Sequence, residues 1–256
     1  MNDILNQTNV DIILPNYNSF PYIEETINSI INQSFKNWNL FIIDDNSNIQ
    51  TQKILDKYGE NPKINIIRLK KNMRAGFCRN LAMRNSKAEY IAFIDSDDIW
   101  DNEKLSKQLI FMIKNKYDFT YTNYMAFKPG THTKDVKKIS PPKSFSFNSF
   151  IKNTSIATSS MIVKKSAIGN IKFSNTKICE DYFFKCQILK KIGYAYCLSE
   201  NLMKYRVRKR SLQSNKIRNL YWIWYINRKF NRLNFFKNFI SLLYISINSL
   251  KKYGFK

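Results

Sequence analysis

Residues 89–100 read EYIAFIDSDDIW and join an apolar run to a cluster of carboxylates. The run at 90–95 (YIAFID) predicts a buried strand, and Asp95, Ser96, Asp97 and Asp98 would lie where that strand opens into solvent. Carboxylates held this close repel one another unless a cation is bound, and oxygen ligands suit Mg²⁺ or Mn²⁺ shared with a diphosphate. The stretch is therefore a candidate divalent-metal site. The alternative is a capped turn, because Asp and Ser both favour helix N-termini.

Strands and helices alternate on the N-terminal side of this stretch. Apolar runs at 10–15 (VDIILP), 40–45 (LFIIDD) and 64–69 (INIIRL) predict three earlier strands. Between them, residues with helical spacing predict helices, and Ser47 with Gln50 is predicted to form a capping box for one of them. The alternation implies βαβ units and an α/β fold with a mainly parallel sheet. Its ligand crevice should lie outside the carboxyl ends of the strands, where the polar clusters at 15–18, 44–47 and 95–98 would meet.

The second half of the chain is harder to interpret. Residues 118–155 contain aromatic, strand-like pieces and a turn at 141–143 (PPK), and 158–163 (TSSMIV) predict another strand. A helix at 179–193 (CEDYFFKCQILKKIG) begins with Glu180 and Asp181 and ends at Gly193. The two acids could serve catalysis, or they could only stabilise the positive end of the helix dipole.

The C-terminal part is strongly basic. The chain of 256 residues has a formal net charge of +23, and no Asp or Glu follows Glu200. Such a field favours polyanionic partners. Residues 1–215 are predicted to form the catalytic domain and residues 216–256 an amphipathic helical extension, in which Phe236, Ile240, Leu243 and Ile247 share one face. The apolar stretch at 239–250 is too short to span a bilayer, so the extension either lies on an anionic membrane surface or packs on the domain.

The number and spacing of the cysteines and histidines exclude several classes of catalytic and metal site. Cys78, Cys179, Cys186 and Cys197 are scattered, with no CxxC pair and no secretory signal before them, which favours reduced thiols in the cytoplasm. The single His132 argues against most histidine-based metal sites and Ser-His-Asp schemes. Carboxylates are therefore expected to carry the reaction.

Taken together, the motifs resemble those of the family 2 glycosyltransferases of the GT-A fold. The resemblance covers residues 10–215 and rests on six ordered motifs. These are VDIILPNYN (10–18), the turn at 33–35 before FIIDDNS (41–47), the Arg79-Asn80 pair after Gly76, EYIAFIDSDDIW followed by KLSKQ (104–108), the Glu180-Asp181 pair, and YRVRKRSLQSNK (205–216). It implies a Rossmann-like, mainly parallel sheet flanked by helices, with the basic and aromatic helical extension at its C-terminus.

The resemblance also implies a donor site for a UDP-sugar. Its nucleobase would pack against Pro15, Tyr17 and Asn18, and Asp45 would bind the uracil ring. The alternative for Tyr17 and Asp45 is that they only form the turn or cap a helix. Asp95 would face the ribose and Asp97 would hold Mn²⁺ or Mg²⁺ on the diphosphate, with Asp95 contributing to the metal site. The donor site further includes Arg79, Ser96, Arg206 and Arg208.

Two positions depart from the family pattern. Arg208 stands where the family often has a histidine, so a metal-ligand role is excluded there, and Arg206 and Arg208 are expected to stabilise the leaving group. Asn46 replaces the usual glycine of the DDGS turn. Because Asn tolerates left-handed backbone angles, the turn should be kept.

The implied activity is that of an inverting hexosyl- or N-acetylhexosaminyl-transferase. Asp181, with Glu180 in reserve, would deprotonate an acceptor hydroxyl on a glycan or lipid-linked glycan. Such enzymes build bacterial surface polysaccharides such as lipopolysaccharide or capsule. The expected location is cytoplasmic, at the inner face of the membrane, with no specific nucleic-acid partner.

Two other functions stay open at this point. A haloacid-dehalogenase-like phosphatase would use Asp95 as a nucleophile, although such enzymes usually place this strand near the start of the fold and here three strands precede it. A non-catalytic protein that binds RNA or membranes through its charge would not need the acidic clusters.

Overall fold

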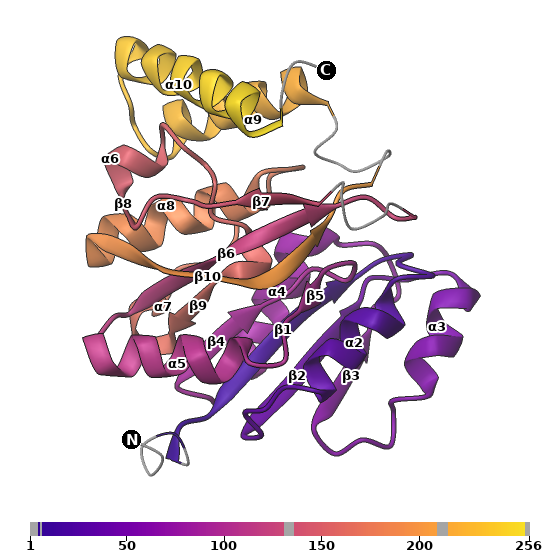
Figure 1. Cartoon of the computed structure of the whole chain (residues 1–256). Coiled ribbons are helices and arrows are strands. Elements are labelled where there is room, and N and C mark those ends of the chain that lie inside the picture. Colours follow the sequence, from indigo (N-terminus) through magenta and orange to yellow (C-terminus); the bar gives the residue numbers. More distant parts are fainter. Residues whose placement is uncertain (1–4, 6, 131–135, 209–214, 254–256) are drawn as a thin grey trace.

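A mixed β-sheet runs through the molecule in the computed structural model, which describes residue 5 and residues 7–130, 136–208 and 215–253 (Figure 1). His132 lies outside the described residues. The strand order is β3-β2-β1-β4-β9-β6-β10-β5, with β7 paired to β6 and β8 to β10. The strands are β1 (Val10–Asn16), β2 (Trp38–Asp44), β3 (Ile64–Arg68), β4 (Tyr90–Phe93), β5 (Ile99–Trp100), β6 (Phe119–Phe127), β7 (Lys137–Ile139), β8 (Ser144–Ser146), β9 (Ile162–Lys164) and β10 (Tyr194–Arg206).

The strands predicted N-terminal to the carboxylate cluster form the parallel half of the sheet. β1 pairs in parallel with both β2 and β4, and β2 pairs in parallel with β3. β9 is antiparallel to β4 and to β6, while β6 and β10 are parallel. The predicted α/β fold is confirmed, as a mixed and mostly parallel sheet.

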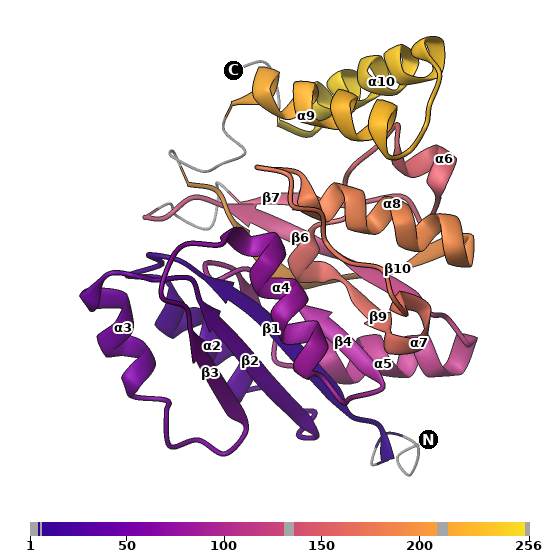
Figure 2. The ribbon, with the colours of Figure 1, turned by 180° about the vertical axis from the view of Figure 1, so that it is seen from behind.

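Helices cover both faces of the sheet because successive strand residues point to opposite sides. Ile12 and Leu14 of β1 pack with α2 (Ile23–Ile31), α3 (Ile49–Asp56) and α5 (Lys104–Asn115). Ile13 points the other way, into a second core with α4 (Arg74–Asn85), α7 (Lys165–Ile168) and α8 (Glu180–Ile192). Figures 1 and 2 show these two layers from opposite sides.

The strand-like, aromatic segment at 118–155 contains the long strand β6. The first six residues of β6 are all buried, the polar Thr120 and Thr122 included, so this part of the strand has no solvent-exposed face. It is followed by β7, β8 and the single turn α6 (Phe147–Phe150). The strand predicted at 158–163 is in part a 3₁₀ turn at Thr158–Ser160, and only its second half continues into β9.

Two helices form the C-terminal part, α9 (Lys216–Lys229) and α10 (Phe235–Tyr253), and they lie beyond α8 and α6 (Figure 1). Ile223, Ile226 and Ile245 join the same core as α8. The Tyr182 hydroxyl of α8 donates to Asn227 Oδ1 at 2.7 Å. The helical pair therefore packs on the α/β fold through one face. No helix within the described residues has the length and apolar character needed to cross a bilayer.

Candidate active site

The polar clusters meet at one edge of the sheet, as predicted. The end of β1 lies beside the end of β2, since Asn16 is in register with Asp44. Asn16 Nδ2 donates to Asp44 Oδ1 at 2.7 Å, and the Asp45 amide donates to the Asn16 carbonyl at 2.8 Å. The end of β4, which leads into Asp95, follows on the other side of β1. Three strand ends thus form a continuous polar edge.

The residues predicted to contact the nucleobase differ in their exposure to solvent. Pro15 is buried within β1, whereas the Tyr17 side chain is 52% exposed. Asn18 has a left-handed φ of 47°, and its Oδ1 accepts from the Asn48 amide at 2.7 Å. Pro15 and Asn18 therefore shape the turn, and Tyr17 offers a free aromatic face. Asn46 also has a left-handed φ, of 64°, which confirms the turn expected there.

Asp45 joins this turn to the start of α4. Its buried carboxylate accepts from the Met73 amide at 2.6 Å and from the Arg74 amide at 2.7 Å. An aspartate that accepts from the first amides of a helix caps the helix, and its negative charge interacts favourably with the positive end of the helix dipole. A turn or cap role was the alternative to uracil binding for Asp45, and the structure shows the cap. The contact of Asp45 with uracil stays a prediction.

Arg79 of α4 links the two predicted halves of the site. Its Nη2 lies 2.6 Å from Asp95 Oδ1, and its Nη1 lies 2.8 Å from Glu180 Oε1. The Arg79 side chain is only 5% exposed. Burial alone would lower its pKa, but Asp95 and Glu180 reverse that effect and raise it. The guanidinium is therefore a permanent cation between the carboxylate predicted for the donor side and the one predicted for the acceptor side.

Gly76 allows α4 to approach this ion-pair network. A Cβ at that position would lie 2.8 Å from the Ser174 carbonyl oxygen and 3.1 Å from Glu180 Cγ. Real Cβ atoms do not come that close to backbone oxygens, so any larger residue would displace the segment that leads to Glu180. One turn later, Asn80 bonds both the amide and the carbonyl of Phe173 and fixes that segment.

Asp97 is paired with the cation that replaces the family's histidine. Asp97 Oδ2 lies 2.6 Å from Arg208 Nε, and the Asp97 side chain is 14% exposed. Burial raises the pKa of Asp97 to about 6, although Arg208 acts in the opposite direction. Ser96 is partly exposed between Asp95 and Asp97, on the same turn.

Arg206 is held by the protein itself. Its Nη2 lies 2.5 Å from Glu25 Oε2, and its Nε donates to the Asp97 carbonyl at 2.7 Å. Its amide donates to the buried Asp98 carboxylate, which also accepts from the Ser159 hydroxyl at 2.5 Å. Burial, together with Asp97, raises the pKa of Asp98. Asp98 and Arg206 thus support the turn, and the contact of Arg206 with a leaving group stays a prediction.

Asp181 is oriented by two neighbours. Its Oδ2 accepts from Lys185 Nζ at 2.8 Å and from the Thr158 hydroxyl at 3.0 Å. Burial would raise the pKa of Asp181, but the Lys185 ammonium outweighs it and lowers the pKa to about 2. Glu180 behaves differently, because burial raises its pKa despite its pairing with Arg79.

The carboxylates at the end of β4 fit a divalent cation that is shared with a ligand. The ion pairs of Asp95 and Asp97 with arginines each use a single oxygen. Among the described residues, no group of three or more acidic, cysteine or histidine side chains is placed to hold a metal ion. Oxygen ligands suit Mg²⁺ and Mn²⁺, which often complete their coordination with substrate phosphates. The pair therefore fits a metal–diphosphate complex better than a metal alone.

Sequence reasoning missed several residues of this network, among them Glu25, Lys185, Thr158 and Ser159. Lys185 carried a signal, since it lies four positions after Asp181 on a predicted helix. Thr158 and Ser159 carried none, because their roles depend on how the 3₁₀ turn meets β4 and α8.

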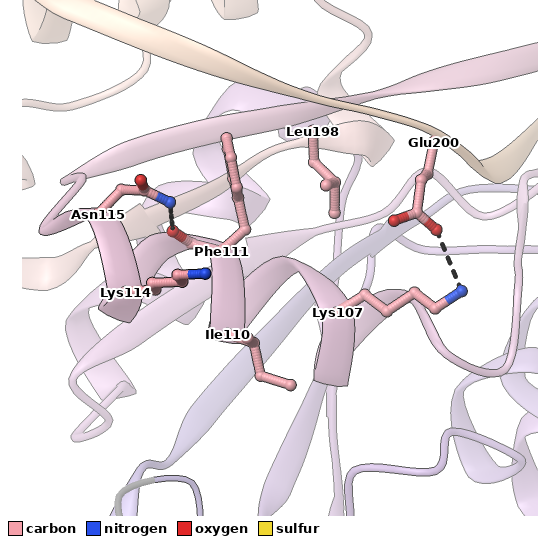
Figure 3. A pocket seen from close by; sticks show the side chains of 7 residues that line it. All are labelled: Lys107, Ile110, Phe111, Lys114, Asn115, Leu198 and Glu200. Carbon is pink, nitrogen blue, oxygen red and sulfur yellow. Dashed lines mark hydrogen bonds and ion pairs between the residues drawn. The ribbon is translucent and has the colours of Figure 1, made fainter. Parts of the chain in front are cut away.

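A surface depression elsewhere contains none of the predicted site residues. It lies between α5 and the middle of β10, and Figure 3 shows its lining, which includes Phe111, Leu198 and the 3.0 Å ion pair of Lys107 with Glu200. Among the described residues that line it, Glu200 is the only acid. The depression therefore lacks the clustered carboxylates that metal binding and proton transfer would need.

Comparisons with known proteins agree with the fold and the motifs. Residues 11–183 match the family model described as glycosyl transferase family 2. TuaG of Bacillus subtilis (strain 168), provisionally named a teichuronic acid biosynthesis glycosyltransferase, is 33% identical over 244 residues, which cover 95% of this chain and 96% of TuaG. WfgD of Escherichia coli, a UDP-Glc:alpha-D-GlcNAc-diphosphoundecaprenol beta-1,3-glucosyltransferase, is 30% identical over 251 residues, which cover 96% of this chain and 95% of WfgD.

A solved structure shows the same fold. The crystal structure of residues 1–349 of S. aureus TarS in complex with UDP-GlcNAc matches with a TM-score of 0.72 and 20% sequence identity, over 95% of this chain and 73% of that chain. The family model spans the carboxylate cluster and the Glu180-Asp181 pair, which excludes the phosphatase and the non-catalytic alternatives. The chain belongs to glycosyl transferase family 2 and is a glycosyltransferase.

Proposed function

We propose that this glycosyltransferase inverts the anomeric centre as it moves a hexose or N-acetylhexosamine from UDP to a hydroxyl of a lipid-linked glycan. Support comes from the WfgD relative, whose name specifies UDP-Glc and a GlcNAc-diphosphoundecaprenol acceptor, and from the TarS complex with UDP-GlcNAc. The observation that carries the proposal is the Arg79 bridge, which holds Asp95 and Glu180 on one guanidinium. Groups for the donor and for the acceptor therefore lie within one site.

Asp181 is assigned the role of general base. Lys185 and Thr158 both bind its Oδ2, which leaves Oδ1 to accept the proton of the acceptor hydroxyl. As that proton leaves, the acceptor oxygen forms a bond to the anomeric carbon, and the bond from that carbon to the UDP oxygen breaks. Glu180 is assigned to hold Arg79 in place.

The donor side is assigned from the other carboxylates. Tyr17 would stack on uracil, and Asp45 would accept from its imide, next to the turn formed by Pro15 and Asn18. A divalent cation on Asp97, with Asp95 beside it, would supply positive charge to the departing diphosphate. Ser96, Arg206 and Arg208 surround this position.

UDP binding is expected to depend on a divalent cation. Isothermal titration calorimetry should detect UDP binding in Mn²⁺ or Mg²⁺ and lose it when EDTA is present, because Asp97 would otherwise face the diphosphate with like charge. Asp97→Asn should weaken binding in Mn²⁺, whereas in EDTA, where it removes the like charge, it should bind UDP at least as well as wild type does. Equal UDP affinity with and without EDTA would remove Asp97 and Asp95 from the metal role.

An acceptor carried by a lipid would require the enzyme to work at a membrane, and α10 offers a surface for it. The predicted apolar stripe of this helix faces outward, with Phe236 76% exposed and Leu243 50% exposed. The buried side contains Asn238 and Ser241 beside Ile245, and Ser241 Oγ donates to the Ile151 carbonyl at 2.5 Å. A helix that buries polar groups and exposes apolar ones is unusual for a protein surface in water.

The charge around α10 selects the partner that we propose for this surface. Lys237 on α10 and Arg232 just before it are exposed, and Lys152 lies 5.4 Å from the Tyr244 ring. No acidic residue follows Glu200. Aromatic and aliphatic side chains among cations fit the interface of an anionic bilayer. We therefore assign α10 to the inner face of the membrane.

The double substitution Phe236→Ser with Leu243→Ser is expected to weaken binding to phosphatidylglycerol vesicles by at least about tenfold, since burying one such side chain contributes roughly 1.5–3 kcal/mol. Vesicle flotation measures this. Ile49→Ser is the matched control, because Ile49 is 63% exposed on α3. Wild-type protein that does not bind the vesicles would contradict the membrane role. Dimers that the double variant loses would show that α10 binds a second copy of the chain instead of lipid.

A further inference from the structure

Arg208 forms an ion pair with Asp97, the carboxylate that is assigned to the metal. Arg208 Nε lies 2.6 Å from Asp97 Oδ2, within ion-pair distance. The Asp97 side chain is 14% exposed and that of Arg208 is 38% exposed. A guanidinium and a divalent cation at this carboxylate would repel each other. Any metal that binds Asp97 must therefore compete with Arg208.

The other site arginine cannot play this part. Arg206 has a 5% exposed side chain and bonds Glu25, the Asp97 carbonyl and, through its amide, Asp98. Its guanidinium also lies 4.5 Å from the Tyr22 ring. Arg208 is held less firmly by the described residues, since its contacts there are Asp97 and the same ring at 5.9 Å. Arg208 can therefore move away from Asp97 without opening the core.

We propose that Arg208 is an internal counter-ion that holds Asp97 in the ligand-free enzyme and yields this carboxylate to a divalent cation only when a nucleotide diphosphate is bound. A diphosphate offers the guanidinium a pair of charged oxygens, which arginine binds in a forked geometry. The competition at Asp97 would then be relieved. The proposal rests on the function proposed above.

Reciprocity gives this proposal a measurable form. If nucleotide relieves the competition, UDP raises the affinity for the metal by the same factor by which the metal raises the affinity for UDP. The free enzyme should bind metal weakly, because Arg208 neutralises Asp97 between turnovers. Removing the guanidinium should strengthen metal binding in the absence of nucleotide and reduce the coupling between the two ligands.

Electron paramagnetic resonance titration with Mn²⁺ alone, on the full-length protein, tests this directly. Arg208→Gln is expected to bind Mn²⁺ about tenfold more tightly than wild type, within the usual range of coupling between sites. Arg208→Lys, which keeps a cation, should stay closer to wild type. Lys204→Gln is the matched control, because Lys204 is exposed on β10 and its loss removes the same charge. Repeating the titration with UDP should bring wild type and Arg208→Gln closer together.

The outcomes separate this proposal from the proposed function. If Arg208→Gln binds Mn²⁺ no more tightly than Lys204→Gln does, while wild type still binds Mn²⁺ in the presence of UDP, the counter-ion role is wrong and the metal-dependent donor site stands. If no variant binds Mn²⁺ with or without UDP, the metal assignment fails and this proposal fails with it.

Discussion

Asp181→Asn is expected to lower the rate of sugar transfer roughly a hundredfold to ten-thousandfold, the usual effect of losing a general base, while UDP affinity stays near wild type. The amide keeps the size of the side chain but cannot take up the proton. Single-turnover transfer and calorimetry with UDP separate the two effects. Asp97→Asn should behave differently and lose donor binding and transfer together, because one interaction supports both.

Glu180→Gln is the control that decides the base. Glu180 has the raised pKa, whereas the pKa of Asp181 is lowered to about 2, so proton affinity alone would favour Glu180. Position favours Asp181, because its side chain is 26% exposed, against 16% for Glu180, and is therefore more open to an acceptor. If Glu180→Gln loses transfer with normal UDP binding and Asp181→Asn does not, the base is Glu180. If both variants keep full activity, the pair only stabilises the start of α8.

Arg79→Met is expected to lower the free energy of unfolding by about 3 kcal/mol, the lower end of the range for breaking a buried ion pair, since Asp95 keeps some contact with solvent. The substitution leaves the carboxylates of Asp95 and Glu180 without their shared cation. Chemical denaturation measures the loss. Arg84→Met, at an exposed position of the same helix, should change stability by no more than about 0.5 kcal/mol.

A second variant tests the cause of that loss. Adding Glu180→Gln to Arg79→Met removes one of the two unpaired charges and should recover part of the stability. Equal destabilisation by Arg79→Met and Arg84→Met would mean that the bridge contributes little. No recovery in the double variant would assign the loss to packing of the arginine side chain instead.

Much of the fold could be predicted because its parallel half is built from uninterrupted apolar strands that end in polar turns. The strands at 10–15, 40–45 and 64–69 all exist, and the helix that begins at Glu180 ends before Gly193 as expected. The capping box of Ser47 and Gln50 was wrong. Asn48 caps that helix, because the Ser47 hydroxyl bonds Asn16 and Asn18 across the strand ends. Local sequence does not reveal a competing partner about 30 residues away.

Contacts between residues far apart in the sequence also separate what could be predicted of the site and of α10 from what could not. The acidic clusters were visible as motifs, but the bridge from Arg79 to Asp95 and Glu180 depends on how α4 and α8 meet. The stripe on α10 was visible as well. Its outward orientation depends on Asn238 and Ser241 finding buried partners, among them the Asn227 amide at 3.0 Å and 3.2 Å.

Transfer from a UDP-sugar to a lipid-linked acceptor can be measured directly. The full-length chain and Mn²⁺ are incubated with UDP-glucose or UDP-N-acetylglucosamine and an N-acetylglucosaminyl-diphosphate-lipid, and the acceptor is followed by mass spectrometry. We expect the acceptor to gain one sugar, UDP to be released in equal amount, and Asp181→Asn to suppress both. Transfer from a GDP-sugar but from no UDP-sugar, or undiminished transfer by Asp97→Asn in EDTA, would contradict the proposed function.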